Sequence, residues 1–307
     1  MSSSRTILDV EHSDPGASIP RGACDCHVHI FGPFDRYPLA ADRVFMPGVA
    51  STDDLLALHA ALGVDRVVIV QASPQGTDNR CMTDALRTLN GAGHAARGVA
   101  VLAPDIGADD LRALHAAGVR GARVNLQSYG QQDPAVARDA LMRTAAQVAD
   151  LGWHVQIYSN LSVISAMART LADCPVPVVI DHFALASAVL GPRQPGLAAL
   201  LRAIEQGNIY VKLSAPYRLT TWEDGRPPSA AGDIARAFID TRLDRMLWGT
   251  DWPHTGSWPG QPRLVDRSEP LHPIDDGLQL AAFCGWVSDK EKQAILVDNP
   301  ARLYQFE

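Results

Sequence analysis

Short β-rich runs alternate with Ala- and Leu-rich stretches of helical character, and this alternation constrains the fold of the chain more than any other feature. The eight β-rich runs lie at residues 24–30, 66–71, 97–102, 121–126, 154–158, 178–182, 209–214 and 246–250. Helical stretches lie between them, for example at residues 52–62, 109–117, 136–151 and 196–206. Eight strand–helix units favour a closed barrel over an open sheet, so the sequence predicts an α/β protein with a single (β/α)8 TIM-like barrel.

The sequence excludes several classes of partner. No GxGxxG follows a strand and no GxxxxGK[ST] occurs, so nothing supports a nucleotide-binding sheet. The net charge is −7 and no basic run offsets it, which argues against a nucleic-acid partner. The strongly apolar runs, such as residues 67–70, are too short to cross a bilayer, so we expect no membrane partner. The sequence is compatible with a homo-oligomer.

The chain is expected to hold one domain. Residues 1–22 are polar, lack the apolar core of a signal peptide and form an N-terminal extension, while residues 23–307 form the barrel. The cysteines are odd in number and scattered, unlike a disulfide framework, so we expect a cytoplasmic protein. Thr52 and Asp53 are candidate N-caps of the helix at 52–62, which Gly63 would end.

Irregular segments at residues 32–50, 215–230 and 254–273 would follow strands 1, 7 and 8. In a barrel of this type that end of the strands carries the active site. The last of these segments is rich in Pro and Trp, and we expect it to shape specificity.

The strongest local motif is Asp-Cys-His-Val-His at residues 25–29. Side chains two apart on a strand share a face, so His27 and His29 are expected to point into the barrel while Cys26 and Val28 face the helices. Two imidazoles on one face suit a metal ion or a polarised carbonyl. Taken alone, the motif fits two structural histidines equally well.

Two further polar residues end apolar strands, at the end of the barrel where catalytic groups lie. His182 ends the run Val-Ile-Asp-His, and Asp251 follows Trp-Gly-Thr near the end of the eighth strand. Asp251 could alternatively be a cap and His182 a core histidine. Together with His27 and His29 they make a chemical set of one water-activating carboxylate and three stabilising imidazoles.

These motifs resemble the amidohydrolase superfamily, of the amidohydrolase-2 type: HxH on strand 1, a later strand-end histidine, and WGTDWPH at residues 248–254. Residues 26–33 (CHVHIFGP) and 71–79 (QASPQGTDN) more narrowly resemble the 2-pyrone-4,6-dicarboxylate hydrolase group and related lactonases. The resemblance extends from residue 23 to 306. It implies a hydrolase that opens a small anionic lactone, in which Asp251 takes a proton from water and the three histidines polarise the carbonyl. The alternatives are a metal-dependent decarboxylase on the same barrel and a barrel kept for binding.

The resemblance also implies residues that bind the substrate carboxylate. The matching positions are Ser73, Thr77, Arg123, Tyr158 and Arg218. Strand alternation supports Arg123, which shares a face with Asn125, and Tyr158, which shares a face with Gln156. Each could instead make a structural contact at the barrel end. His254 follows Asp251 by three residues and is expected to orient Asp251 or to touch substrate.

The sequence allows two interpretations of the metal content, a site without metal and a site with a single zinc. Residues 121–126 hold no lysine, and Lys212 on strand 7 lies in the wrong place, so a dinuclear site with a carboxylated lysine is not expected. A single zinc held by His27, His29, His182 and Asp251 is chemically reasonable. The pyrone-dicarboxylate group is understood to work without metal, and by that resemblance we expect no required cofactor, with one zinc as the alternative.

One departure from the resemblance concerns substrate charge. The related hydrolases carry a second basic residue shortly after the strand-4 arginine, where this chain has Tyr129 and no Lys or Arg. An unpaired carboxylate is costly to desolvate, so the sequence favours a monoanionic lactone over a dicarboxylate. Activity on a dicarboxylate would instead point to an arginine from the last loop, Arg263 or Arg267.

Overall fold

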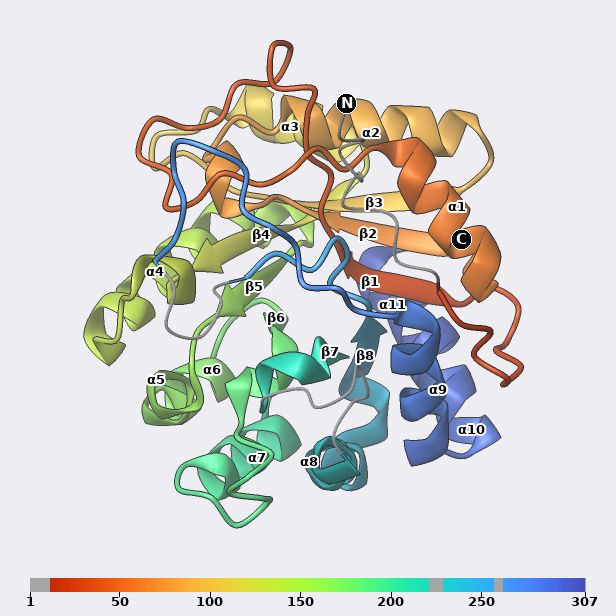
Figure 1. Cartoon of the computed structure of the whole chain (residues 1–307). Helices are drawn as coiled ribbons and strands as arrows, with labels where there is room; N and C mark the ends of the chain where they lie inside the picture. Colours follow the sequence, from red (N-terminus) through yellow and green to blue (C-terminus); the bar gives the residue numbers. More distant parts are fainter. Residues whose placement is uncertain (1–11, 221–228, 257–261, 307) are drawn as a thin grey trace.

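A computed structural model describes residues 12–220, 229–256 and 262–306, and it confirms the barrel (Figure 1). Eight parallel strands are hydrogen-bonded in the order β1 to β8, each to its neighbour in sequence. Figure 1 shows the helices arranged around these central strands. The strands are β1 (Cys24–Val28), β2 (Arg66–Val70), β3 (Ala95–Ala100), β4 (Val119–Asn125), β5 (His154–Tyr158), β6 (Val178–Ile180), β7 (Ile209–Ser214) and β8 (Met246–Gly249).

The helices occupy the stretches between and after the strands. They are α1 (Thr52–Leu62), α2 (Arg80–Gly91), α3 (Ala108–Ala116), α4 (Pro134–Val148), α5 (Leu161–Ala166), α6 (Ala168–Ala172), α7 (Leu197–Gln206), α8 (Ser229–Arg242), α9 (Asp276–Trp286), α10 (Asp289–Gln293) and α11 (Asn299–Tyr304). Within the described residues, no helix is both long and apolar enough to span a bilayer.

One cap differs from the sequence expectation. Ser51, rather than Thr52 or Asp53, caps α1, because its hydroxyl accepts from the Asp54 amide while the Asp54 carboxylate accepts from the Ser51 amide. This reciprocal pair satisfies two amides that the first turn leaves unbonded. Gly63 ends the helix as expected, with a left-handed φ of 75°.

The barrel closes between β1 and β8 at the level of the HxH motif. The His29 amide donates to the Trp252 carbonyl (2.8 Å), and the Asp251 amide donates to the His27 carbonyl (2.9 Å). Two residues before His27 in β1, the buried Asp25 carboxylate accepts from the amides of His27 and Thr250. These bonds fix the two strands that carry His27, His29 and Asp251 against each other.

A register shift in β1 overturns the simple alternation expected there. Asp25 pairs with Val67 and Val28 pairs with Ile69, so β1 has one residue more than β2 over this stretch. A bulge of this kind turns consecutive side chains toward one face. Cys26 therefore packs inside the barrel, in a cluster with Val68, Val70, Val99, Val179, Tyr210 and Leu247, and does not face the helices as predicted.

The C-terminal residues close the end of the barrel opposite the motif-bearing strand ends. Tyr304 and Phe306 belong to the interior cluster. Arg97 of β3 donates to the carbonyls of Tyr304 and Gln305, and its guanidinium lies 4.9 Å from the centre of the Phe306 ring. This closure leaves the loops after the strands as the open end.

Three long connections follow β1, β7 and β8, as the sequence predicts, although residues 221–228 and 257–261 of the latter two lie outside the described residues. The boundary expected between an extension at 1–22 and a barrel at 23–307 stays a prediction. Residues 1–11 lie outside the described residues, and residues 12–22 hold no helix or strand. The Ser13 amide and hydroxyl donate to Asp275 at the start of α9, so this part of the chain lies against the barrel.

Candidate active site

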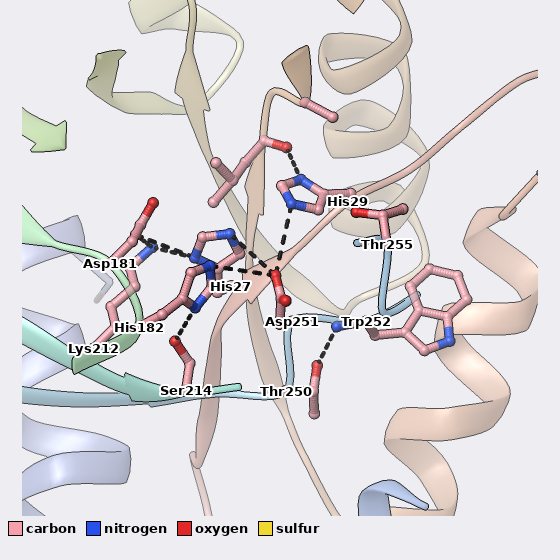
Figure 2. A network of polar contacts seen from close by, with 12 residues as sticks. His27, His29, Asp181, His182, Lys212, Ser214, Thr250, Asp251, Trp252 and Thr255 are labelled. Atoms are coloured by element: carbon pink, nitrogen blue, oxygen red, sulfur yellow. Dashed lines mark hydrogen bonds and ion pairs between the residues drawn. The ribbon is translucent and has the colours of Figure 1, made fainter. Parts of the chain in front are cut away.

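The strand ends bring His27, His29, His182 and Asp251 together at the open end of the barrel (Figure 2). The exposed fraction of each residue is 5% or less. His182 and Asp251 adopt left-handed backbone conformations, with φ of 47° and 69°. Such conformations cost about 1–3 kcal/mol in residues other than glycine and cluster at functional sites.

The two oxygens of Asp251 have different surroundings. Oδ1 faces the Nε2 atoms of His27, His29 and His182 at 3.6, 3.8 and 3.6 Å. Oδ2 accepts from the Tyr217 hydroxyl (2.6 Å) and from Arg218 Nε and Nη2 (2.9 and 2.6 Å). The carboxylate is therefore anchored through Oδ2 and presents Oδ1 to the imidazoles.

In His29 and His182 the Nδ1 atom has a hydrogen-bonding neighbour, while Nε2 faces Asp251. His29 Nδ1 lies 2.7 Å from the Val70 carbonyl, and His182 Nδ1 lies 2.8 Å from the Ser214 hydroxyl. A carbonyl only accepts, so neutral His29 carries its proton on Nδ1 and a lone pair on Nε2. His29 Nε2 thus faces the Asp251 carboxylate without a proton to donate.

A buried ion network lies beneath His27. Lys212 Nζ donates to Gln156 Oε1 (2.7 Å), and lies 3.3 Å from His27 Nδ1 and 3.7 Å from Asp181 Oδ1. Asp181 Oδ1 is also 3.3 Å from His27 Nδ1. From the sequence, Lys212 was considered only as a metal-bridging lysine and set aside, whereas its ammonium group contacts His27.

Charge and burial shift the pKa values of this network. Burial lowers the pKa of Lys212 to about 8, partly offset by Asp181. Burial alone would raise the pKa of Asp181, but His27 and Lys212 hold it well below its usual range. Burial likewise opposes ionisation of Asp251, but Arg218 and the three histidines hold its pKa well below the ordinary value. Both carboxyl groups are therefore ionised near neutral pH.

The site histidines are neutral near pH 7, because burial lowers the pKa of His29 and of His182 to about 4. Burial also lowers the pKa of His154, inside the barrel, to about 3. In an unfolded chain each would titrate near 6.5. Between about pH 6.5 and 4 the unfolded chain therefore binds protons that the folded protein does not.

We predict that the free energy of unfolding falls as pH decreases through this window. The three histidines together contribute a slope that approaches about 4 kcal/mol per pH unit near pH 5. Urea unfolding at pH 7.5, 6.5 and 5.5 measures the effect, and His154→Gln, which lies away from the substrate cavity, should flatten the curve. Constant stability from pH 7.5 to 5.5 would show that these histidines are charged in the folded protein.

Three of the four residues, His27, His182 and Asp251, fit a single metal ion, because their ligand atoms all lie within 4.8 Å of one another. His29 Nε2 faces the same oxygen of Asp251 but lies outside this group. His27 Nε2 and Asp251 Oδ1 have no hydrogen-bond partner among the described residues, although both are buried. A tetrahedral zinc with bonds of about 2.1 Å holds its ligand atoms about 3.4 Å apart, close to the 3.6–3.8 Å between Asp251 Oδ1 and the imidazoles. Three imidazole nitrogens and a carboxylate oxygen are also ligands that zinc prefers.

A cavity of about 290 Å³ opens above this cluster. Four of the predicted substrate-binding residues, Ser73, Arg123, Tyr158 and Arg218, line it together with His29, His182 and Asp251. Its remaining lining residues are Phe45, Ala72, Asn125, Gln127, Ser128, Gly130, Thr255, Gly256 and Arg263. A larger hollow of about 420 Å³ lies between the first loop and α2 and contains none of the four clustered residues. The smaller cavity is the candidate substrate site, because His29, His182 and Asp251 line it.

Two predicted substrate-binding residues lie elsewhere. Thr77 lines a separate groove beside residues 103–117, because the 3₁₀ turn after β2 carries it past the cavity. His254 Nε2 is bonded to the Asp276 carboxylate at the start of α9 (2.9 Å), and His254 does not line the cavity. Its left-handed φ of 65° turns the side chain away from the cavity lining.

Two residues that act through others, Tyr217 and Asp181, were not predicted from the sequence. Tyr217 precedes Arg218 and shares its bond to Asp251, and Asp181 precedes His182 and contacts His27. Each lies next to a predicted site residue in the sequence, and this adjacency was the available signal. Arg263 also lines the cavity, from the loop that the sequence marked as unusual.

Comparison with known proteins agrees with this geometry. A family model described as "Amidohydrolase" matches residues 24–306. The chain is 36% identical over 304 residues to a 2-pyrone-4,6-dicarboxylate hydrolase of Comamonas testosteroni, covering 95% of this chain and 93% of the relative. It is 29% identical over 293 residues to a 4-sulfomuconolactone hydrolase of Hydrogenophaga intermedia, covering 93% and 89%. A crystal structure of a putative 2-pyrone-4,6-dicarboxylic acid hydrolase from Pseudomonas putida superimposes with a TM-score of 0.75 at 31% identity, covering 94% and 99%.

Proposed function

This chain belongs to the amidohydrolase family, and from that premise we propose that it is a hydrolase that opens a small anionic lactone by adding water to the ring ester. One observation carries the proposal: the free oxygen of Asp251 faces three imidazoles at the floor of a cavity lined by arginines. The names of the relatives, which act on a pyrone dicarboxylate and a sulfomuconolactone, support the same reaction class.

The residues divide the reaction between them. Asp251 Oδ1 accepts a proton from water as the water oxygen bonds to the lactone carbonyl carbon. Tyr217 and Arg218 hold Oδ2, so the carboxylate keeps its orientation while Oδ1 accepts the proton. The ring C–O bond then breaks, and the leaving oxygen takes the proton back from Asp251. The product is an open-chain hydroxy or keto acid with one new carboxylate.

The tautomer of His29 determines whether this residue can stabilise the lactone carbonyl without a metal ion. Neutral His29 has no proton on Nε2, so it cannot donate a hydrogen bond to a lactone carbonyl, and its pKa of about 4 keeps it neutral. We therefore propose the zinc alternative: one ion held by His27, His29, His182 and Asp251. When bound, zinc would supply the positive charge that makes water more acidic and stabilises the developing oxyanion. In this arrangement Asp181 and Ser214 orient two of the ligand rings.

We predict that the purified protein retains about one zinc per chain, and that adding zinc to chelated protein raises its Tm, because binding stabilises the folded state. Elemental analysis and thermal unfolding measure both, and His29→Ala should lose most of the metal and of the Tm shift. His115→Gln, on α3 and bonded to Trp153, is the control and should retain both. Full activity in protein that holds no metal would overturn the zinc proposal and return to the expectation of no required cofactor.

A panel of lactones tests the reaction itself. Hydrolysis releases a proton, so a pH indicator can follow 2-pyrone-4,6-dicarboxylate, muconolactones and aldonolactones in one assay. We expect turnover of at least one anionic lactone. Release of CO₂ from an aromatic carboxylic acid, with no lactone opened, would contradict the hydrolase and support the decarboxylase alternative.

A further inference from the structure

Three guanidinium groups line the cavity, from Arg123, Arg218 and Arg263, against the single carboxylate of Asp251. These three guanidinium groups outnumber that one carboxylate, so the lining carries an excess of positive charge. The first two arginines are tied to carboxylates of the catalytic centre: Arg218 to Asp251, and Arg123 to Asp181 at 3.5 Å. Arg263 is instead paired with Glu269, a carboxylate that contacts none of the four clustered residues among the ion pairs of the described residues.

Arg263 is held in a fixed orientation. Its Nε and Nη2 donate to the two oxygens of the buried Glu269 at 2.8–3.0 Å. Its guanidinium lies 4.0 Å from the centre of the Phe45 ring, which also lines the cavity. An arginine that is already ordered loses little side-chain entropy when it binds a ligand.

The backbone around Arg263 is also anchored. The Met46 amide donates to the Leu264 carbonyl (2.7 Å), and the Glu269 amide donates to the Met46 carbonyl (2.8 Å). Arg43 Nη2 donates to the Val265 carbonyl (2.6 Å). The loop after β8 is therefore joined to the loop after β1, and this joint sets Arg263 and Phe45 at the cavity wall.

Arg263 retains a hydrogen-bonding edge for a ligand. Its Nη1 has no hydrogen-bond partner among the described residues, and 26% of its side chain is exposed. The positions after β4 where related hydrolases carry a second basic residue contribute Ser128 and Gly130 to the cavity instead. The cation that the sequence analysis found missing there is thus present, but it comes from another loop.

We propose that Arg263 is the specificity-determining residue that pairs with a second carboxylate of the substrate, so that the enzyme prefers a dicarboxylated lactone. This reverses the expectation of a monoanionic lactone and rests on the lactonase function proposed above. The first carboxylate then binds on the side of Arg218 and Tyr158, and the ring spans the cavity toward Phe45 and Arg263. A guanidinium can bind one carboxylate through Nε and Nη2 and a second through Nη1.

Matched substrates test the proposal. Steady-state kinetics would compare 2-pyrone-4,6-dicarboxylate with 2-pyrone-6-carboxylate on the wild type, Arg263→Met, Arg263→Lys and Arg267→Met. We expect the wild type to prefer the dicarboxylate and Arg263→Met to lower its kcat/KM by about 10- to 100-fold, mainly through KM. The monocarboxylate should be nearly unaffected, and Arg263→Lys should recover part of the loss. Arg267, exposed in the same loop, is the control and should behave as wild type.

Binding without turnover separates the two proposals. Calorimetry with benzene-1,3-dicarboxylate and with benzoate measures how much a second carboxylate adds to the binding affinity, even if no lactone is opened. Tighter binding of the dicarboxylate that Arg263→Met removes would support Arg263 whatever the reaction is. Equal loss for mono- and dicarboxylated ligands, or no preference in the wild type, would overturn the proposal, whereas absence of lactone opening alone would count against the proposed function only.

Discussion

Replacing Asp251 by asparagine is expected to lower kcat for the lactone by about 10²–10⁴ while the protein stays folded. The amide has nearly the shape of the carboxylate, and its oxygen can still accept from Tyr217 and Arg218 in the place of Oδ2. The position of Oδ1 is then filled by an NH₂ group, which cannot take a proton from water. The reaction loses its general base but keeps the cavity.

Stopped-flow or steady-state proton release measures the loss, and circular dichroism with a thermal scan checks the fold. Asp105→Asn, at an exposed position between β3 and α3, is the matched control and should keep full activity. An Asp251→Asn protein that folds normally and retains near-wild-type kcat would require another base, and Asp251 would then be a structural or ligand residue only.

The barrel was predictable because its signals are local. Each strand is a short apolar run of its own, and the order of eight such runs leaves few other folds. The orientation of Cys26 was not predictable, because the bulge in β1 depends on its pairing with β2. Alternation is a rule for regular strands, and the extra residue that turns His27 toward the site also turns Cys26 into the barrel.

The four clustered site residues were predictable for a related reason. Strand ends converge on one face of a barrel, so polar residues there come together wherever they lie in the sequence. Their partners follow no such rule. Tyr217 reaches Asp251 because of the turn after β7, and Arg263 reaches the cavity because its loop is joined to residues 43–47. Such contacts between loops leave no periodic pattern in the sequence.

The contacts of Lys212 likewise leave no pattern in the sequence. Its replacement is expected to have a large effect on stability. Lys212 is fully buried (0% exposed), and its ammonium nitrogen lies 3.7 Å from Asp181 Oδ1, while Arg123 Nη2 lies 3.5 Å from Asp181 Oδ2. We predict that Lys212→Met lowers the free energy of unfolding by about 3 kcal/mol, because it removes one of the two buried cations beside a buried carboxylate. Gln156 Nε2, at 3.1 Å from Asp181 Oδ2, replaces only part of that interaction.

Asp181→Asn should cost less than Lys212→Met, and this asymmetry is the sharper test. The pKa of Lys212 is already lowered to about 8, so without Asp181 the lysine can lose its proton near neutral pH and remain buried as a neutral amine. The double variant Lys212→Met/Asp181→Asn removes both charges of this pair and should recover part of the stability that Lys212→Met loses. Urea unfolding of the three variants at pH 7.5 gives the coupling between the two changes. Additive losses would show that Lys212 and Asp181 do not interact as a pair, and that Lys212 supports His27 by packing alone.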